Sequence, residues 1–188
     1  MAVQRLVIHV IGVPLALGKQ ISSLSGGRVR VVELHELLPA GSPGAIELAG
    51  INAMGNWQHY RKRWGELLVQ QLERTLDDTD RHAPLLLLGI AQHPAGPPDD
   101  KPLELPCVTH RFIVEPDHGQ LLRQFYGPFI DQMRDDDAFW TAVAEKRILI
   151  PASVDIMRDA DRRFVWHVEH GYRSVAAADM LREISSLL

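Results

Sequence analysis

The sequence has little cysteine, no long apolar run and no excess of positive charge, and each of these absences excludes a class of protein. Cys107 is the only cysteine, which excludes an intrachain disulfide and a cysteine-rich zinc site. No apolar run reaches the ~18 residues that a membrane-spanning helix needs. The formal net charge of −4 gives no general attraction to nucleic acid or anionic lipid. Neither a membrane nor nucleic acid is therefore an expected partner, and the cytoplasm is the default location.

Length and composition are those of a folded domain. Hydrophobic residues make up 46% of the chain and charged residues 23%, which is ordinary for a globular protein. A chain of 188 residues can bury one core without disulfides or a structural metal. We therefore expect residues 1–188 to form a single α/β domain.

Apolar runs rich in β-branched residues alternate with helical patterns along the chain. The run RLVIHVIG at 5–12 predicts a central strand that is covered on both faces. Further strands are predicted at the start of 28–38 and at 84–91, 107–115, 147–152 and 163–169. Helices are predicted at 14–24, 57–76, 118–133 with a kink or break at Gly127 and Pro128, 135–146, and from 175 onward with Ser174 as the cap. The segments 39–56 and 92–106 are interpreted as long irregular loops.

The alternation of strands and helices decides the expected fold class. Strand, helix and strand in close succession favour right-handed parallel crossovers. The sequence therefore predicts a three-layer, Rossmann-like α/β sandwich with a largely parallel sheet of five or six strands.

The stretch GVPLALGKQ, residues 12–20, raises the question of phosphate binding. A phosphate-binding loop follows the pattern G-x-x-x-x-G-K-[ST], in which backbone N–H groups, the lysine and the hydroxyl meet phosphate and magnesium. Here five residues instead of four separate Gly12 from Gly18, and Pro14 removes an N–H donor. Gln20 follows Lys19, where a serine or threonine would hold the metal. The pattern therefore argues against a nucleotide-hydrolysing loop.

Two other interpretations of this stretch stay open. In one, Gly12 makes a strand-to-helix turn, and Leu15 and Ile21 pack the helix onto the sheet. In the other, the turn leads into a helix N-terminus that attracts an anion near Gly12, Gly18 and Lys19. The stretch resembles degenerate nucleotide-binding loops and the first turn of nucleotide-sensing Rossmann-like domains of the CARF and SAVED kind, over about 30 residues. The resemblance implies a nucleotide or another anionic ligand at this turn.

Polar residues follow each predicted strand, where open parallel sheets bind their ligands. They are Gly12, His35 and Glu36, Gln92 and His93, Asp117 and His118, and Ser153 and Asp155. Parallel strands would gather them along one edge, although loops carry polar residues in any case. We predict as ligand-binding residues Gly12, Gly18, Lys19, His35, Glu36, Gln92 and Ser153. The candidate acid–base residues are His35, His93, His118 and Asp155.

Other patterns have simpler explanations. The two histidines of HVEH at 167–170 would face opposite sides of a straight strand, so no metal site is predicted. The motifs H-E-x-x-H and G-x-S-x-G are absent. Arg61, Lys62 and Arg63 lie opposite the aromatic stripe of their helix and are interpreted as a solvated face. The sequence points to no particular cofactor.

Three function hypotheses from different classes remain. The first is a binding or sensing domain for a nucleotide or another anionic small molecule. The second is a small hydrolase or transferase that uses the acid–base candidates. The third is an inert interaction module whose loops at 39–56 and 92–106 dock a partner protein or a second copy. The lack of a complete catalytic motif counts against the second, and the lack of strongly hydrophobic loops against an obligate interface, so the first is favoured.

Overall fold

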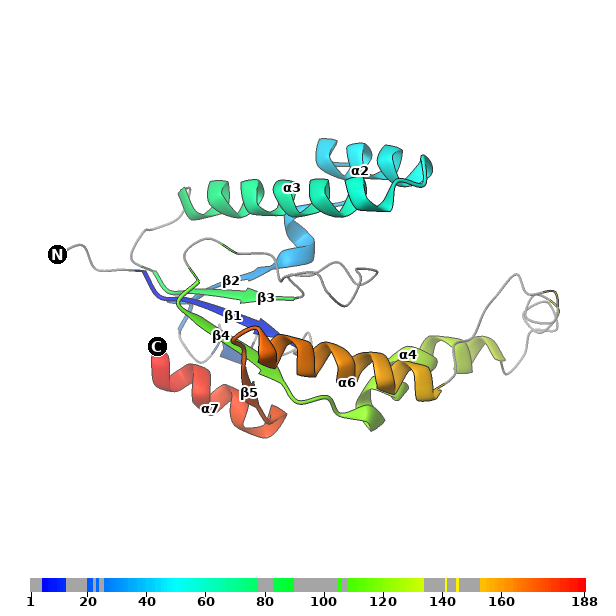
Figure 1. Ribbon diagram of the computed structural model, residues 1–188. Helices are drawn as coiled ribbons and strands as arrows, with labels where there is room; N and C mark the ends of the chain where they lie inside the picture. The colour runs from blue at the N-terminus through cyan, green and yellow to red at the C-terminus, as the bar shows by residue number, and fades with distance from the viewer. Residues whose placement is uncertain are drawn as a thin grey trace. The chain divides into compact units, whose positions relative to one another are not determined.

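The computed structural model divides the chain into two compact units. The first unit combines Met1–Val114 with His167–Leu188, and the second is Glu115–Trp166. The structure describes residues 5–12, 20–21, 23, 26–77, 83–89, 105, 108–133, 141, 145 and 153–188, without the side chains of 124–125 and 128–133. The first unit contains the sheet and the helices that cover it (Figure 1).

The sheet of the first unit has five described strands, all parallel to their neighbours. They are β1 (Val7–Ile11), β2 (Arg30–Glu33), β3 (Leu85–Leu88), β4 (His110–Val114) and β5 (Arg173–Val175), in the order β2-β3-β1-β4-β5. All residues of β1 and β3 are buried. Continuous burial is typical of parallel strands with helices on both faces. The predicted α/β fold with a parallel sheet is confirmed.

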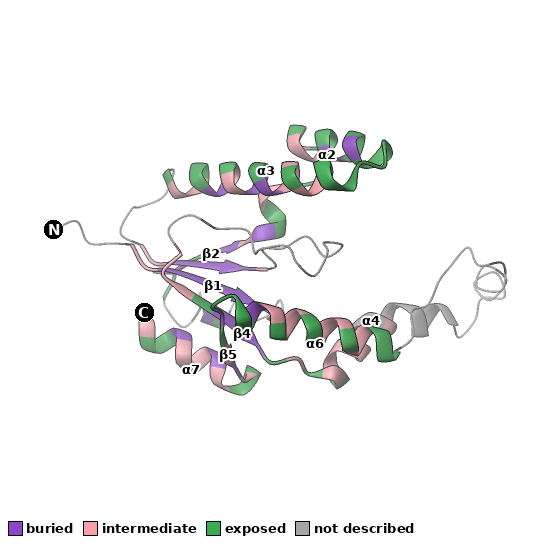
Figure 2. Cartoon of the chain, in the orientation of Figure 1, coloured by how far each residue is buried: buried purple, intermediate pink, exposed green. Residues whose placement is uncertain are grey.

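Helices cover both faces of this sheet, which gives three layers. Helix α3 (Trp57–Asp77) packs on one face and α7 (Ala177–Leu187) on the other (Figures 1 and 2). The core under α3 includes Val7, Leu68, Leu72, Leu85 and Leu87. The core under α7 includes Ile8, Val10, Ile21, Phe112, Met180 and Ile184. Strand β1 contributes to both cores because successive side chains of a strand point to opposite faces.

Between β2 and α3 the chain forms the 3-10 helix η1 (Leu34–Leu37) and the helix α2 (Pro43–Ala53). Ser42 caps α2, since its hydroxyl accepts a hydrogen bond from the N–H of Ala45 at 3.2 Å, and Pro43 begins the first turn. The prediction of an irregular loop over 39–56 is therefore wrong. The apolar residues of α2 are spread around the helix and lack the periodicity that would have revealed it.

In the second unit the structure describes α4 (His118–Met133) and most of α6 (Ser153–Glu169), which enters the first unit at His167. The predicted strand at 163–169 is wrong, because these residues belong to α6. Asp159 pairs with Arg162 at 2.9 Å and with Arg163 at 2.6 Å, and the spacings of three and four residues match a helix.

Two smaller differences from the sequence-based expectations concern α4 and the start of α7. Helix α4 continues through Gly127 and Pro128, so the expected break is absent; the missing N–H of a proline costs one backbone hydrogen bond, and the helix continues on its other bonds. Ser174 lies in β5 instead of capping a helix, and α7 begins after Ala176.

The predicted strand at 147–152 lies outside the described residues, as do most of 14–24 and 135–146. No described helix is long and apolar enough to cross a membrane.

Candidate functional site

Two glycines in the left-handed region follow the central strands at their carboxyl ends. Gly12 follows β1 with φ of +80°, and a Cβ there would lie 3.4 Å from the carbonyl oxygen of Val114. Gly89 follows β3 with φ of +117°, and a Cβ there would lie 3.5 Å from the Cβ of Leu34. L side chains rarely adopt such conformations. Both glycines therefore allow a turn close to the neighbouring backbone at the same edge of the sheet.

A pocket of about 640 Å³ opens beside Gly89, between η1, α2 and α3. Its other lining residues are the apolar Leu34, Leu38, Ala45, Leu48 and Ala49, the aromatic Tyr60 and Trp64, and the polar His35 and Asn52. The volume lies within the range of small-molecule sites. The described part of the lining contains no lysine, arginine or carboxylate, so it suits the uncharged part of a ligand.

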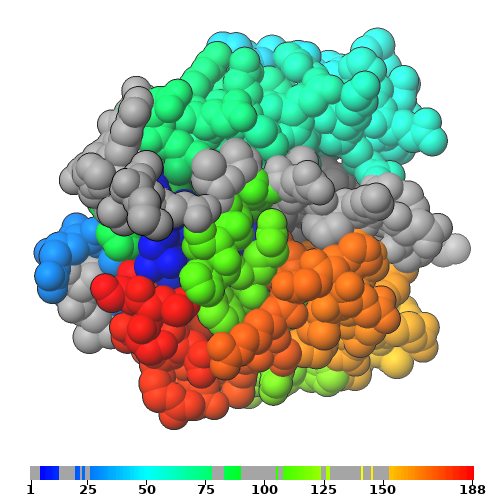
Figure 3. Space-filling view, turned by 60° about the vertical axis from the view of Figure 1, so that its left-hand side comes forward, coloured from blue at the N-terminus to red at the C-terminus, as the bar shows by residue number. Residues whose placement is uncertain are grey.

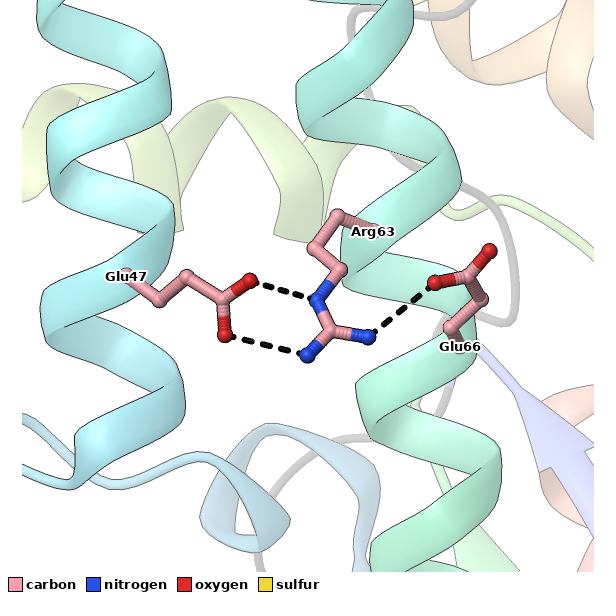
Figure 4. A network of polar contacts seen from close by, with 3 residues as sticks. All are labelled: Glu47, Arg63 and Glu66. Carbon is pink, nitrogen blue, oxygen red and sulfur yellow. Dashed lines mark hydrogen bonds and ion pairs between the residues drawn. The ribbon is translucent and has the colours of Figure 1, made fainter.

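The two helices that wall the pocket are joined by Arg63 of α3. Its Nε and Nη2 donate to the two carboxylate oxygens of Glu47 of α2 at 2.6 and 3.1 Å, and Nη1 donates to Glu66 at 3.1 Å (Figure 4). The hydrogen bonds from Arg63 lower the pKa of the Glu47 carboxyl, and those to the carboxylates raise the pKa of Arg63. In the space-filling view, α2 and α3 pack along each other (Figure 3, cyan to green). The ion pair thus joins the two walls at an exposed site.

Replacing Arg63 by alanine is expected to lower the melting temperature slightly at low salt. The ion pair is exposed, so it contributes little, and about 1 M NaCl, where the Debye length is ~3 Å, should remove the difference from the wild type. Thermal unfolding in low and high salt measures the effect. Lys62→Ala, one residue away and exposed, is the matched control. A loss for Arg63→Ala that stays the same in high salt would contradict an electrostatic role.

His9, in the middle of β1, is a fully buried polar side chain that reaches the same edge of the sheet. Its Nε2 lies 2.9 Å from the carbonyl oxygen of Gly89, and its Nδ1 lies 2.9 Å from the hydroxyl of Tyr172. A carbonyl only accepts hydrogen bonds, so Nε2 carries the hydrogen and Nδ1 accepts from the tyrosine. The ring of His167 stands edge-on to Tyr172, with 5.1 Å between centroids. His9 therefore connects the pocket's Gly89 to the residue before β5.

The surroundings of His9 keep its ring neutral. Burial lowers its pKa from 6.5 to about 4; the hydrogen bond to the Gly89 carbonyl opposes this, and the charges of His167 and Arg111 add to it. Burial likewise raises the pKa of Tyr172 to about 12. At neutral pH both groups are thus uncharged, as two buried hydrogen-bonding partners should be.

The structure brings some of the predicted site residues to one edge of the sheet. Gly12 follows β1, and His35 and Glu36 follow β2 on η1. His35 lines the pocket and is exposed, with Nδ1 3.4 Å from a carboxylate oxygen of Glu33. The predicted residues outside the described part of the chain are Gly18, Lys19, Gln92 and His93.

The other predicted residues belong to the second unit. His118 begins α4, and its Nε2 lies 2.7 Å from Asp161 of α6. Ser153 and Asp155 lie in the first turn of α6 and are exposed, and Asp155 pairs with Arg158 at 3.5 Å. The His118 and Asp161 pair is thus a histidine–carboxylate contact within the second unit.

Glu33, His35 and Glu36 place possible metal-ligand atoms within 4.8 Å of one another. The sequence-based interpretation predicted no metal site. Exposed acidic groups commonly gather in this way without an ion, and no second feature of the described residues marks a cation here. Glu33 and Glu36 affect the pocket through their negative charge, which lies beside His35.

Sequence reasoning missed His9 and the pocket. Of the aromatic stripe of 57–76, Trp64 packs against the core under α3 and also lines the pocket with Tyr60, and Trp57 is 51% exposed. The available signal for His9 was a polar residue inside an otherwise apolar central strand, since such a residue needs buried partners. No comparable signal marks the pocket, because its lining comes from separate elements.

These features define the chain as a three-layer α/β protein with a parallel sheet and a ligand-sized pocket at the carboxyl edge of that sheet. Comparison with protein-family models, with curated proteins and with solved structures gives no match. The fold and the pocket are therefore the basis for inferring a function.

Proposed function

We propose that this chain is a binding or sensing domain for an anionic small molecule, and for a nucleotide in particular. The observation that carries the proposal is the pocket, which opens beside Gly89 at the carboxyl edge of the sheet. Open parallel sheets bind their ligands at this edge. The pocket adds a concave, mostly apolar surface with two polar side chains, which is the usual composition of small-molecule sites.

The anionic part of the ligand is assigned to the turn after β1. Gly12 has a left-handed conformation at the start of this turn, and Gln20 and Ile21 further along the chain are helical. Helix N-termini attract anions through their unpaired N–H groups and the helix dipole. Lys19 precedes these helical residues and would add a positive charge.

Each of the other two hypotheses keeps one supporting observation. The pair of His118 and Asp161 at 2.7 Å is an arrangement that a hydrolase or transferase could use. The exposed apolar residues Ile46, Met54 and Trp57 suit an interaction module that docks a partner protein or a second copy. Neither observation includes a concave site, so both hypotheses rank below ligand binding.

A thermal-shift screen tests the proposal with nucleotides, cyclic oligonucleotides and sugar phosphates. A ligand that binds only the folded state should raise the melting temperature by about 5–10 °C at a concentration 100-fold above its Kd. Lys19→Ala should weaken the response without lowering the melting temperature of the free protein, whereas Lys62→Ala should respond like the wild type. The absence of a shift with every phosphate-bearing compound would argue against the proposal and favour a search for partner proteins.

A further inference from the structure

We infer that the pocket between η1, α2 and α3 takes an uncharged, planar heteroaromatic ring, as in a nucleobase, and that the phosphate of the same ligand stays outside it. The inference rests on the proposed function and deepens it. It assigns recognition of the ring to Asn52, Tyr60 and Trp64, and recognition of the anion to the turn after β1.

The charges around the pocket exclude the anionic end of a ligand from its interior. No lysine or arginine is among the described lining residues, and Glu33 at the end of β2 and Glu36 of η1 lie beside His35. A phosphate in this place would lose its hydration without gaining a positive partner, and the two carboxylates would repel it. The group that enters the pocket is therefore neutral.

The side chains of the pocket suit a planar ring with polar edges. Tyr60 and Trp64 are four residues apart in α3 and thus lie on the same face of the helix, one turn from each other. Aromatic side chains bind nucleobases by stacking, which every base permits. Asn52 offers a carbonyl acceptor and an amide donor, and such a carboxamide can form paired hydrogen bonds with the edge of a base.

The pocket and the turn after β1 are close enough for one ligand. Leu88 of β3 is paired with Val10 of β1, and the N–H of Gly89 donates to the carbonyl of Val10 at 3.1 Å. Gly89 is thus beside the end of β1, and Gly12 follows on a strand about 4.8 Å away. A ring in the pocket and a phosphate at Gly12 can therefore belong to the same nucleotide.

Calorimetric titration of the full chain separates the two parts of the ligand. The probes are adenosine, guanosine, cytidine and uridine, their 5′-monophosphates, and ribose 5-phosphate. We expect at least one nucleoside to bind without a phosphate, and its monophosphate to bind more tightly. Lys19→Ala should weaken binding of the monophosphate while leaving the affinity for the nucleoside unchanged.

Two variants of α2 and one control on the same helix test whether the ring binds in the pocket. Ala49 is solvent-exposed and lines the pocket, so Ala49→Phe should fill it and weaken nucleoside binding at least tenfold. Ala53→Phe, the same change on the same helix outside the lining, should bind like the wild type. Asn52→Leu should reduce the preference among the four nucleosides. Melting temperatures of all three variants show whether they remain folded.

The outcomes distinguish failure of this inference from failure of the proposed function. If ribose 5-phosphate bound as tightly as the monophosphates and no nucleoside bound, the inference would be overturned while anion binding stood. If nucleosides bound but Ala49→Phe and Asn52→Leu both left their affinity unchanged, the ring would lie elsewhere and the inference would again be overturned. If none of the probes bound, both this inference and the proposed function as a nucleotide-binding domain would be overturned.

Discussion

Replacing His9 by alanine is expected to lower the free energy of unfolding by about 3–5 kcal/mol. The side chain is fully buried and makes hydrogen bonds to the carbonyl of Gly89 and the hydroxyl of Tyr172, both at 2.9 Å. The substitution opens a cavity and leaves the buried hydroxyl of Tyr172 and the partly buried carbonyl of Gly89 without their partner, and each of these effects is costly. Urea unfolding followed by far-UV circular dichroism measures the change.

Tyr172→Phe is the matched partner variant for this experiment. It removes one hydroxyl and keeps the ring, so the expected loss is about 1–3 kcal/mol. The double variant should lose less than the sum of the two single losses, because both remove the same hydrogen bond. Additive losses, or a loss below about 1 kcal/mol for His9→Ala, would show that the buried pair does not stabilise the fold as we describe.

Lowering the pH from 7 to 4 is expected to cost the protein about 3 kcal/mol of stability through His9 alone. Its pKa is about 4 in the folded protein, against an ordinary value of 6.5. Between these two values the unfolded chain takes up a proton that the folded protein does not. The contribution is therefore fully present above pH 6.5 and is lost as the pH falls toward 4.

The variant His9→Gln isolates this effect, since glutamine can still donate and accept hydrogen bonds but does not titrate. Other histidines and the carboxylates titrate in both proteins, so the difference between the two pH profiles belongs to His9. Unfolding free energies at pH 7, 5.5 and 4 give the profiles. The wild type should lose more stability than the variant across this range, and parallel profiles would disprove the assignment.

The strongest local patterns predicted the sheet and its long helix correctly. The apolar run at 5–12 forms β1. A central strand that is covered on both faces has no side facing solvent, so its residues are mostly apolar and do not alternate with polar ones. The stripe of 57–76 became α3, since its leucines recur every three or four residues. The alternation of strands and helices was enough for the fold class, but it does not determine strand order.

The wrong prediction of a strand came from a segment whose helical periodicity appears only over a longer stretch of sequence. Residues 163–169 contain β-branched and aromatic side chains and were interpreted as a strand. Together with 153–162 they form one helix, in which the ion pairs of Asp159 reach Arg162 and Arg163. The β-branched residues, taken over a short stretch, do not show the helical periodicity of the whole segment.

The candidate site was predictable only in part. Parallel strands end at the same edge of a sheet, so the shared position of Gly12 and His35 follows from the alternation of strands and helices in the sequence. The hydrogen bond between His9 and Tyr172 joins residues far apart in the chain, so no local pattern could reveal it. The pocket likewise depends on how η1, α2 and α3 pack, which is a tertiary property.

The position of β1 in the sheet also constrains how the protein is made. Val7 pairs with Leu85 and Ile8 with His110, so β1 is synthesised before both of its neighbours in the sheet. Until β3 emerges, the sequence VIHVI has an open edge in the nascent chain. Such distant pairing slows folding and leaves apolar strands available for association with other chains. Early handling by chaperones would therefore serve this protein more than one whose paired strands follow each other directly in the chain.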